Sequence, residues 1–235
     1  MNENVNNLFT SIAKRYDLIN TILTLNIDSI WRKKTVALCQ LKKNDKILDL
    51  CCGTGQMCMK LINTHVRDIS VTGLDFNDEM LKVARKKLDQ LSGSCGIDLI
   101  QGDILALPFP DKEFDVVTIA FGIRNIAEKE TAFAEILRVL KPGGRVICLE
   151  LSKPDMFLFR SVYSLYFDHV LPFVGYLVSR DKAAYYYLRN SVNHFMSKPQ
   201  LKSLMSDSGL VNVDYMSLSG GIASIHYGNK PGGIL

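Results

Sequence analysis

The middle of the chain alternates short apolar runs with amphipathic segments. Each apolar run has the length and β-branched content of a buried strand, and apolar positions at helical spacing follow it. The clearest helix places Phe133, Ile136, Leu137 and Leu140 at i, i+3, i+4 and i+7, as in a helix docked on a sheet. The five predicted strands of this region are residues 46–50, 70–74, 97–101, 115–120 and 146–151. Such alternation predicts an α/β fold, a mostly parallel sheet with helices on both faces.

The two ends of the chain depart from this alternation. Residues 3–40 carry a helical pattern, and a long apolar segment at 156–178 interrupts the alternation after the fifth strand. One more helix and two more strands follow, near residues 199–207, 210–218 and 222–227. We therefore predict one domain over residues 1–235, with an amino-terminal helical cover at 1–42 and a helical substrate lid inserted at 155–195.

The first predicted strand ends in a glycine-containing loop, Asp49-Leu50-Cys51-Cys52-Gly53-Thr54-Gly55. Glycines there let a ligand approach the backbone closely, although an ordinary tight turn uses glycine too. Asp75 ends the next strand, where an ionised carboxylate suits the two hydroxyls of a ribose. A dinucleotide-binding loop would need a third glycine where this chain has Cys58. Because the loop also lacks a Gly-Lys-Ser/Thr sequence, it predicts a nucleoside ligand without phosphates.

A third acidic residue follows the third strand. Asp103 can accept from an adenine amino group while the amide of Ile104 serves a ring nitrogen, although an aspartate here also suits a turn or a cap. With the glycine loop and Asp75, it forms a pattern that closely resembles the class I methyltransferases. The resemblance implies S-adenosyl-L-methionine as cofactor and a Rossmann-like, seven-stranded sheet in the order 3-2-1-4-5-7-6. The cofactor-binding residues that it implies are Asp49, Gly53, Thr54, Gly55, Asp75, Asp103, Ile104 and, through its backbone, Ala120.

Three further stretches narrow the resemblance to one family. They are Arg138 to Arg145 with Leu149 to Pro154, then Tyr16-Asp17-Leu18-Ile19-Asn20, then Phe121-Gly122-Ile123-Arg124-Asn125. In these stretches, and from about residue 16 to the carboxyl end, the chain is similar to the ubiquinone and menaquinone C-methyltransferases. It departs from their amino-terminal signature at Ile19, Thr24 and Asp28. The last departure reverses a charge, so Asp28 is assigned no role.

The resemblance also implies a reaction. Members of this family methylate a ring carbon of a polyprenylated quinol, so we expect conversion of demethylmenaquinol to menaquinol, the final step of menaquinone biosynthesis. A dual enzyme that also serves ubiquinone, and a small-molecule O- or N-methyltransferase of the same fold, stay open as alternatives. The Cys51-Cys52 pair is closer to the menaquinone-type members, although core packing is the favoured explanation of both thiols.

Methylation at carbon requires an electron-rich ring, which a quinol provides when its neighbouring hydroxyl ionises. Arg124 is the candidate for lowering the pKa of that hydroxyl, because a guanidinium keeps its charge. A structural ion pair is the competing interpretation of the same arginine. Asn125 is expected to orient the same oxygen, and Tyr16 to bond the ring hydroxyl or line the pocket. His169 is a candidate proton acceptor, although a lone histidine in an apolar segment is more often simply packed.

Two other classes of function fit less well. Amino-directed base methylation uses an Asn/Asp-Pro-Pro-aromatic sequence after the fourth strand, where this chain has Ala120-Phe121-Gly122. Because the chain also carries no added nucleic-acid domain, no nucleic-acid partner is expected. A non-catalytic protein that binds the cofactor for assembly is the second class. Loss of activity in Arg124→Ala with normal cofactor binding would exclude it.

Composition and the amino terminus bear on the expected protein class and cellular location. The chain is 47% apolar and 22% charged, with a formal charge of +4, as in an ordinary globular protein. Its six cysteines show no metal-type spacing, so no metal is expected, and its polar start has no signal-peptide pattern. We therefore expect a cytoplasmic protein. The oligomeric state stays open, with a homodimer among the options.

The segment at 156–178 bears on membrane contact. Charged residues and a proline interrupt it, so it does not read as a membrane span. With Arg160, Arg180 and Lys182 nearby, it is a candidate for transient contact with a membrane surface, where it would receive the tail of a lipid-soluble polyprenyl quinol. That contact would make the protein peripheral on the inner face of the cytoplasmic membrane.

Overall fold

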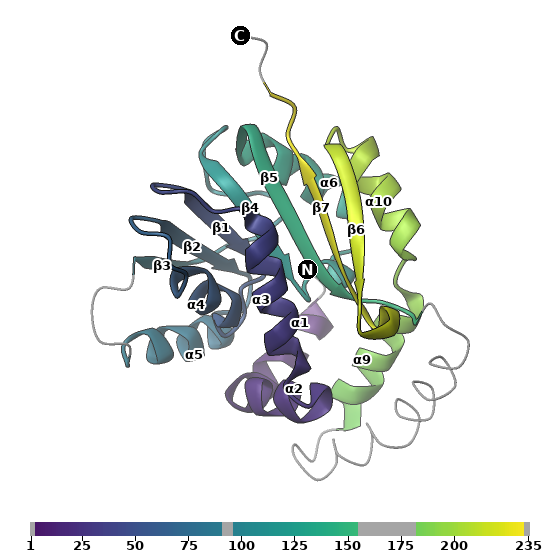
Figure 1. The fold of residues 1–235 in the computed structure, drawn as a ribbon. Helices are drawn as coiled ribbons and strands as arrows, with labels where there is room; N and C mark the ends of the chain where they lie inside the picture. Colours follow the sequence, from purple (N-terminus) through teal and green to yellow (C-terminus); the bar gives the residue numbers. More distant parts are fainter. Residues whose placement is uncertain (1–2, 91–95, 155–181, 233–235) are drawn as a thin grey trace.

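A seven-stranded sheet lies at the centre of the computed structural model, which describes residues 3–90, 96–154 and 182–232 (Figure 1). Its strands are β1 (Lys46–Leu50), β2 (Ser70–Asp75), β3 (Ile97–Gln101), β4 (Phe114–Ala120), β5 (Leu140–Leu151), β6 (Val211–Leu218) and β7 (Ala223–Asn229). They lie in the order β3-β2-β1-β4-β5-β7-β6. Strand β7 is antiparallel to β5 and β6, and the other neighbours are parallel. The predicted fold class and strand order are confirmed.

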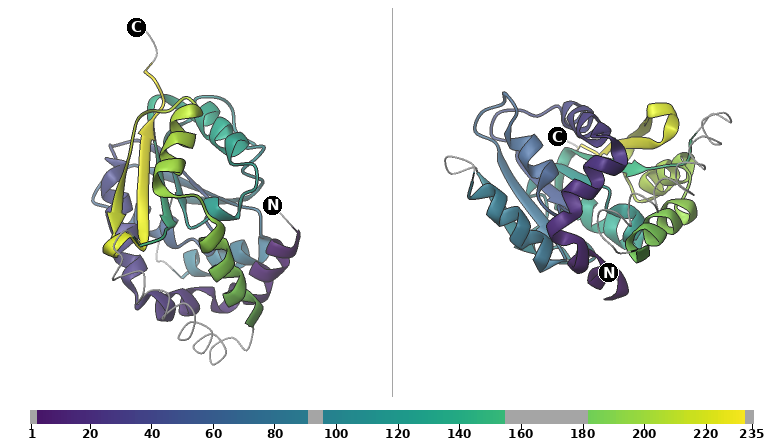
Figure 2. Two further views of the ribbon diagram at one scale, coloured as in Figure 1. Left: turned by 90° about the vertical axis from the view of Figure 1, so that its right-hand side faces the viewer. Right: turned by 90° about the horizontal axis from the view of Figure 1, so that it is seen from below.

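Helices cover both faces of this sheet (Figure 2). They are α1 (Glu3–Ile12), α2 (Tyr16–Thr24), α3 (Ile27–Cys39), α4 (Gln56–Ile62), α5 (Asp78–Leu88), α6 (Lys129–Val139), α9 (Lys182–His194) and α10 (Lys198–Asp207), with 3-10 turns η1 (Ala13–Arg15), η2 (Ile123–Asn125) and η4 (Ser219–Gly221). Alternate residues of a strand enter opposite cores. Leu48 joins Phe133 of α6 on one face, and Ile47 joins Trp31 of α3 and Leu61 of α4 on the other.

The amino-terminal region folds as three helices. Leu25 and Asn26, between α2 and α3, have positive φ angles of 50° and 63°, which reverses the chain there. Helix α3 is then fastened to the sheet, because Trp31 Nε1 donates to Ser219 Oγ at 2.9 Å. Helices α1 and α2 are left beyond the carboxyl ends of the parallel strands, where ligands of such sheets bind. In the described part of the chain, no helix is long and apolar enough to cross a membrane.

Particular residues set the boundaries of the elements. Leu140 continues the apolar spacing of α6 but begins β5 instead, because Pro142 disfavours helical backbone at Lys141 and the helix ends ahead of it. Asn77 caps α5, since its Oδ1 accepts from the amide of Met80 at 2.9 Å. The apolar segment at 156–178, and with it His169, lies outside the described residues. Of the predicted lid at 155–195, the structure describes α9 and the turn after it.

Candidate active site

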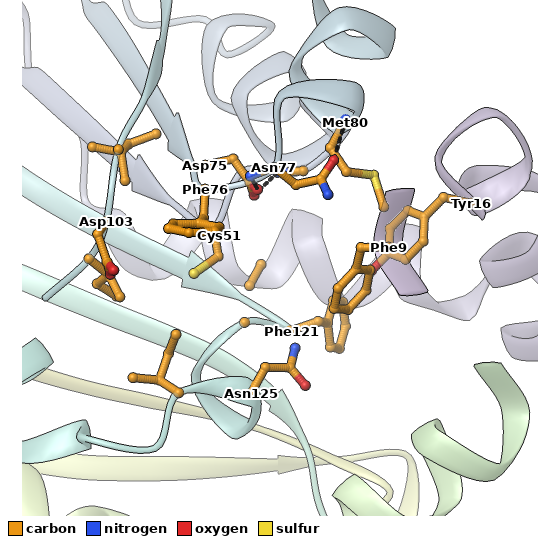
Figure 3. Close-up of a pocket in the computed structure, with 17 residues that line it drawn as sticks. Phe9, Tyr16, Cys51, Asp75, Phe76, Asn77, Met80, Asp103, Phe121 and Asn125 are labelled. Atoms are coloured by element: carbon orange, nitrogen blue, oxygen red, sulfur yellow. Dashed lines mark hydrogen bonds between the residues drawn. The ribbon is translucent and has the colours of Figure 1, made fainter. Parts of the chain in front are cut away.

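A hollow lies at the carboxyl ends of β1, β2, β3 and β4 (Figure 3). Asp103 lies at one end of it, and Phe9 and Tyr16 from the amino-terminal helices lie at the opposite end. The predicted site residues that line it are Tyr16, Gly53, Asp75, Asp103, Ile104, Ala120 and Asn125. The predicted site residues that lie outside its lining are Asp49, Thr54, Gly55 and Arg124. Sequence reasoning therefore located this edge of the sheet and most of one wall.

The glycine loop leaves β1 with an unusual backbone. Cys51, Gly53 and Gly55 all have positive φ angles, of 53°, 55° and 77°. A Cβ on Gly53 would meet nothing within 4 Å, whereas one on Gly55 would lie 3.3 Å from the Cβ of Ala84 in α5. The two glycines thus have different structural roles. Gly53 leaves an open approach for a ligand, and Gly55 allows the loop to pack against α5.

Asp75 fastens this loop to the end of β2. Its Oδ2 accepts from the amide of Gly53 at 2.7 Å, and its Oδ1 accepts from the amide of Asn77 at 2.9 Å. Burial raises the pKa of Asp75, and the hydrogen bonds from backbone amides act in the opposite direction. Each oxygen of an ionised carboxylate has a second lone pair. The carboxylate on the wall of the hollow therefore retains acceptor capacity suited to a diol.

Asp103 and Ile104 form the far end of the hollow. Asp103 Oδ1 accepts from the amide of Leu105 at 3.0 Å, so the carboxylate also stabilises the turn that follows β3. Ile104 is 3% exposed and contributes an apolar wall beside it. An acidic acceptor next to an apolar surface suits a heteroaromatic ring that carries an amino group. Both interpretations of Asp103, as a turn residue and as a wall of the site, hold together.

Asp49 lies behind the hollow. It is fully buried, its Oδ1 accepts from Thr118 Oγ1 at 2.7 Å, and its Oδ2 accepts from Cys58 Sγ at 3.2 Å. Burial raises its pKa to about 6. Asp49 therefore links β1 to β4 and to α4 just before the chain enters the glycine loop. Direct contact between Asp49 and a cofactor stays a prediction.

The chain leaving β4 approaches the glycine loop very closely. Phe121 has a positive φ angle of 62°, and a Cβ on Gly122 would lie 2.5 Å from the Cβ of Cys51. Only glycine fits at position 122. Cys51 lines the hollow, and burial raises its thiol pKa well above the ordinary value, which keeps the thiol neutral. This supports packing as the role of Cys51.

Arg124 forms a buried ion pair. Its Nη1 lies 2.7 Å from Glu150 Oε1 and donates to the carbonyl of Phe121 at 2.6 Å, and the two side chains are 5% and 0% exposed. Burial acts to lower the pKa of Arg124, but the charge and hydrogen bond of Glu150, together with Tyr16 and Tyr187, outweigh it and the pKa is raised. The Nε of Arg124 is buried without a hydrogen-bond partner among the described residues. The structural pair and an available donor thus coexist in one guanidinium.

Two aromatic residues that sequence reasoning missed complete the site. Tyr187 of α9 donates its hydroxyl to Asn125 Oδ1 at 2.8 Å. Phe9 of α1 lies edge-on to both Tyr16 and Tyr187, with ring centroids 6.1 Å and 6.4 Å apart. The tyrosine run at 185–187 carries no signal that singles out its third member. Phe9 lies before the family-like signature begins, in a segment where only a helix was expected.

The amino-terminal helices are hydrogen-bonded to the glycine loop. Asp17 Oδ1 accepts from Thr54 Oγ1 at 2.6 Å, its Oδ2 pairs with Lys87 Nζ, and Lys87 also donates to the carbonyl of Thr54 at 3.0 Å. We call these three residues the Asp17 clamp. A second link runs from Asn77 Nδ2 to Asn6 Oδ1 at 2.7 Å. The helices that close the hollow are therefore held by the loops that form its floor.

The chain is similar to known proteins over nearly its whole length. A model of the ubiE/COQ5 methyltransferase family matches residues 1–230. Curated relatives include the demethylmenaquinone methyltransferases of Staphylococcus aureus strains JH9 and Newman. Each is 39% identical over 228 residues, which is 97% of this chain and 93% of the relative. The similarity therefore spans the hollow, the amino-terminal helices and the carboxyl-terminal strands.

Solved structures share the fold at lower identity. The [4+2]-cyclase SpnF superposes with a TM-score of 0.66 at 20% identity, covering 86% of this chain and 81% of SpnF. A SAM-dependent methyltransferase from Aquifex aeolicus superposes with a TM-score of 0.62 at 17% identity, covering 84% of this chain and 88% of its own. Within the part of the chain that the structure describes, no three His, Cys, Asp or Glu side chains are placed to hold a metal ion.

Proposed function

Because this chain belongs to the ubiE/COQ5 methyltransferase family, we propose that it transfers a methyl group from S-adenosyl-L-methionine to a ring carbon of demethylmenaquinol, giving menaquinol. One observation carries the proposal. Relatives named demethylmenaquinone methyltransferases are 39% identical over 228 residues, which is 97% of the chain. In this proposal the acceptor is a lipid-soluble polyprenyl quinol, and the protein is cytoplasmic and meets the quinol at a membrane surface.

The wall of the hollow suits the nucleoside part of the donor. Gly53 leaves open space at the loop, Asp75 offers carboxylate oxygens for the ribose hydroxyls, and Asp103 and Ile104 bound a place for the adenine. Ala120, at the end of β4, is 9% exposed and offers its backbone to the donor in the same hollow. When bound, S-adenosylmethionine supplies an activated methyl on a sulfonium, and the protein supplies alignment. Holding two reactants in line is worth up to about 7–11 kcal/mol of the barrier.

The acceptor ring fits between β4 and the aromatic residues of the cover. Asn125 and Tyr16 line the hollow, and Tyr187 holds the side-chain amide of Asn125 in one orientation. Asn125 Oδ1 already accepts from Tyr187, so its Nδ2 is turned to donate to a ring oxygen. Phe9 packs over both tyrosines and keeps water from the ring.

Arg124 is proposed to stabilise the phenolate. Its Nε is buried without a hydrogen-bond partner among the described residues and is the donor proposed for a ring oxygen, and Glu150 holds the guanidinium in place. Glu150 also cancels much of the positive charge of Arg124. The phenolate would therefore be stabilised by a directed N–H hydrogen bond rather than by a bare cation. With the ring oxygen ionised, the ring carbon would take the methyl group as the carbon–sulfur bond of the sulfonium breaks and leaves a neutral thioether, and the ring carbon would then release its proton to water.

Methyl transfer to two reduced acceptors tests the proposal. The protein is incubated with radiolabelled S-adenosylmethionine and either demethylmenaquinol or the demethylated ubiquinol precursor, and mass spectrometry locates the label on the ring. Label on the naphthoquinol ring alone is the expected result. Label on both rings would establish the dual enzyme. Cofactor binding without label on either ring would refute the quinol assignment and favour a small-molecule O- or N-methyltransferase.

A further inference from the structure

Exposed apolar side chains gather on the α2–α3 turn. Of the seven large hydrophobic residues that are exposed in the described part of the chain, four lie between residues 18 and 30. We call these four the apolar ridge: Leu18, Leu25, Ile27 and Ile30, with exposed fractions of 55%, 79%, 37% and 54%. Leu18 lies on α2 and Leu25 in the turn that follows this helix, and Ile27 and Ile30 are three residues apart on one face of α3. Contiguous exposed apolar surface marks an interaction site.

Basic side chains flank this ridge, and its acidic neighbours are neutralised. Lys14, Arg15, Lys33 and Lys34 are all exposed. The only acidic residues between positions 14 and 34 are Asp17 and Asp28. Asp17 pairs with Lys87, and Asp28 lies 3.6 Å from Arg32 Nε and accepts from Thr24 Oγ1 at 2.8 Å. Apolar residues surrounded by net positive charge are complementary to an anionic lipid surface.

The ridge and the hollow share helix α2. Tyr16, the first residue of α2, lines the hollow, and Leu18 follows two residues later. Helix α2 lies beyond the carboxyl ends of the parallel strands (Figure 1). We propose that the apolar ridge docks on an anionic lipid bilayer, so that a polyprenyl quinol reaches the hollow with its tail still in apolar surroundings. This inference rests on the proposed function for its choice of substrate.

A second copy of the chain is a weaker occupant of the ridge. A two-fold interface here would bring the lysines at 33 and 34 of one copy against those of the other, which is repulsive. Stable dimers bury about 800 Å² on each partner, more than four partly exposed side chains provide. A bilayer needs no such area, because shallow insertion of a few apolar side chains adds to the attraction of lysines for anionic headgroups.

Vesicle binding tests the docking. The parent chain and the variant Leu25→Glu/Ile30→Glu are sedimented with vesicles of phosphatidylcholine, with or without phosphatidylglycerol. The parent should bind the anionic vesicles, release them at high salt and bind neutral vesicles weakly. The double variant should bind at least about tenfold more weakly. A matched control, Val211→Glu/Met216→Glu, places two glutamates at residues of β6 that are each 41% exposed, and it should bind as the parent does.

Turnover separates docking from chemistry. On demethylmenaquinol held in vesicles, the ridge variant should lose about tenfold in rate, whereas on a tail-less naphthalenediol its rate should match the parent's. Equal vesicle binding by parent and ridge variant would overturn the proposal. A parent that is a dimer in solution, with a monomeric ridge variant and no vesicle binding by either, would identify the ridge as a contact between copies. A parent that methylates neither acceptor yet binds vesicles through the ridge would refute the proposed function alone.

Discussion

The charged residues around the hollow are compensated one at a time within the described structure. Arg124 has Glu150, the carboxylate of Asp75 has two backbone amides, and Asp17 has Lys87 and Thr54. A buried charge without such a partner would be strongly destabilising. What distinguishes Arg124 is that one of its donors, Nε, is still unused among the described residues. At the scale of the residue, therefore, we expect one guanidinium to serve both stability and the proposed catalytic role, and mutation should separate the two.

Variants of Arg124 and Glu150 make that separation. Arg124→Met alone leaves Glu150 buried and unpaired, and should lower the free energy of unfolding by about 3–5 kcal/mol. The double variant Arg124→Met/Glu150→Gln should recover most of this stability but keep a kcat reduced about 100-fold, because the directed donor is still missing. Urea denaturation and methyl transfer at saturating donor measure the two effects. A double variant with near-normal kcat would show that the arginine is only structural.

Helices α1, α2 and α9 make the cover of the hollow, and each is attached differently. Helix α1 reaches the β2–α5 loop through Asn77, α2 reaches the glycine loop through the Asp17 clamp, and α9 reaches η2 through Tyr187. These are side-chain bonds between elements that lie far apart along the chain. At the scale of the element, the geometry of the cofactor loop and the position of the cover are linked.

The Asp17 clamp should therefore influence cofactor affinity without touching the cofactor. Asp17→Asn should weaken S-adenosylmethionine binding by about three- to tenfold, because a partly exposed ion pair holds the glycine loop in place. Lys87→Met should have a similar effect, and the double variant should show little further loss, since both residues belong to one interaction. Calorimetric titration of the cofactor gives the affinities. Asp28→Asn, on the same amino-terminal cover but bonded to Arg32 and Thr24, is the matched control. Fully additive losses would contradict the clamp.

At the scale of the whole molecule, local features of the fold could be predicted from the sequence and long-range contacts could not. The positions of the central strands, the glycine loop and Asp75 follow from local periodicity and from residues at strand ends, whereas the strand order comes from the resemblance to the class I methyltransferases. The Arg124–Glu150 pair spans 26 residues, and the bond from Asp17 to Thr54 spans 37. No local pattern encodes such contacts. The resemblance pointed to Glu150 and Asp17 as parts of signatures, but their partners required the fold.

Stability of the whole fold should depend on pH through Asp49. Its pKa is near 4 in an unfolded chain and about 6 in the fold, so between these values the folded state binds more protons. Stability contributed by neutral Asp49 is therefore present below pH 4 and is lost as pH rises to about 6. Asp49→Asn removes this dependence, and the stability of the variant relative to the parent should improve by about 2–3 kcal/mol between pH 4 and pH 7.

Urea denaturation of both proteins across that pH range measures the difference. Asp207→Asn, which changes an exposed carboxylate at the end of α10, serves as the control and should show no such trend. A constant difference between Asp49→Asn and the parent would mean that Asp49 is ionised in the fold throughout.

Three consecutive residues at the start of α2 face three different surroundings. Tyr16 lines the hollow, Asp17 bonds Thr54 of the glycine loop, and Leu18 is 55% exposed on the outer surface. Successive residues of a helix differ in direction by about 100°, so one rigid turn presents all three at once. A rotation of α2 about its own axis could not move one of these side chains alone. A rotation of α2 would therefore shift a wall of the hollow, a contact with the glycine loop and part of the outer surface together.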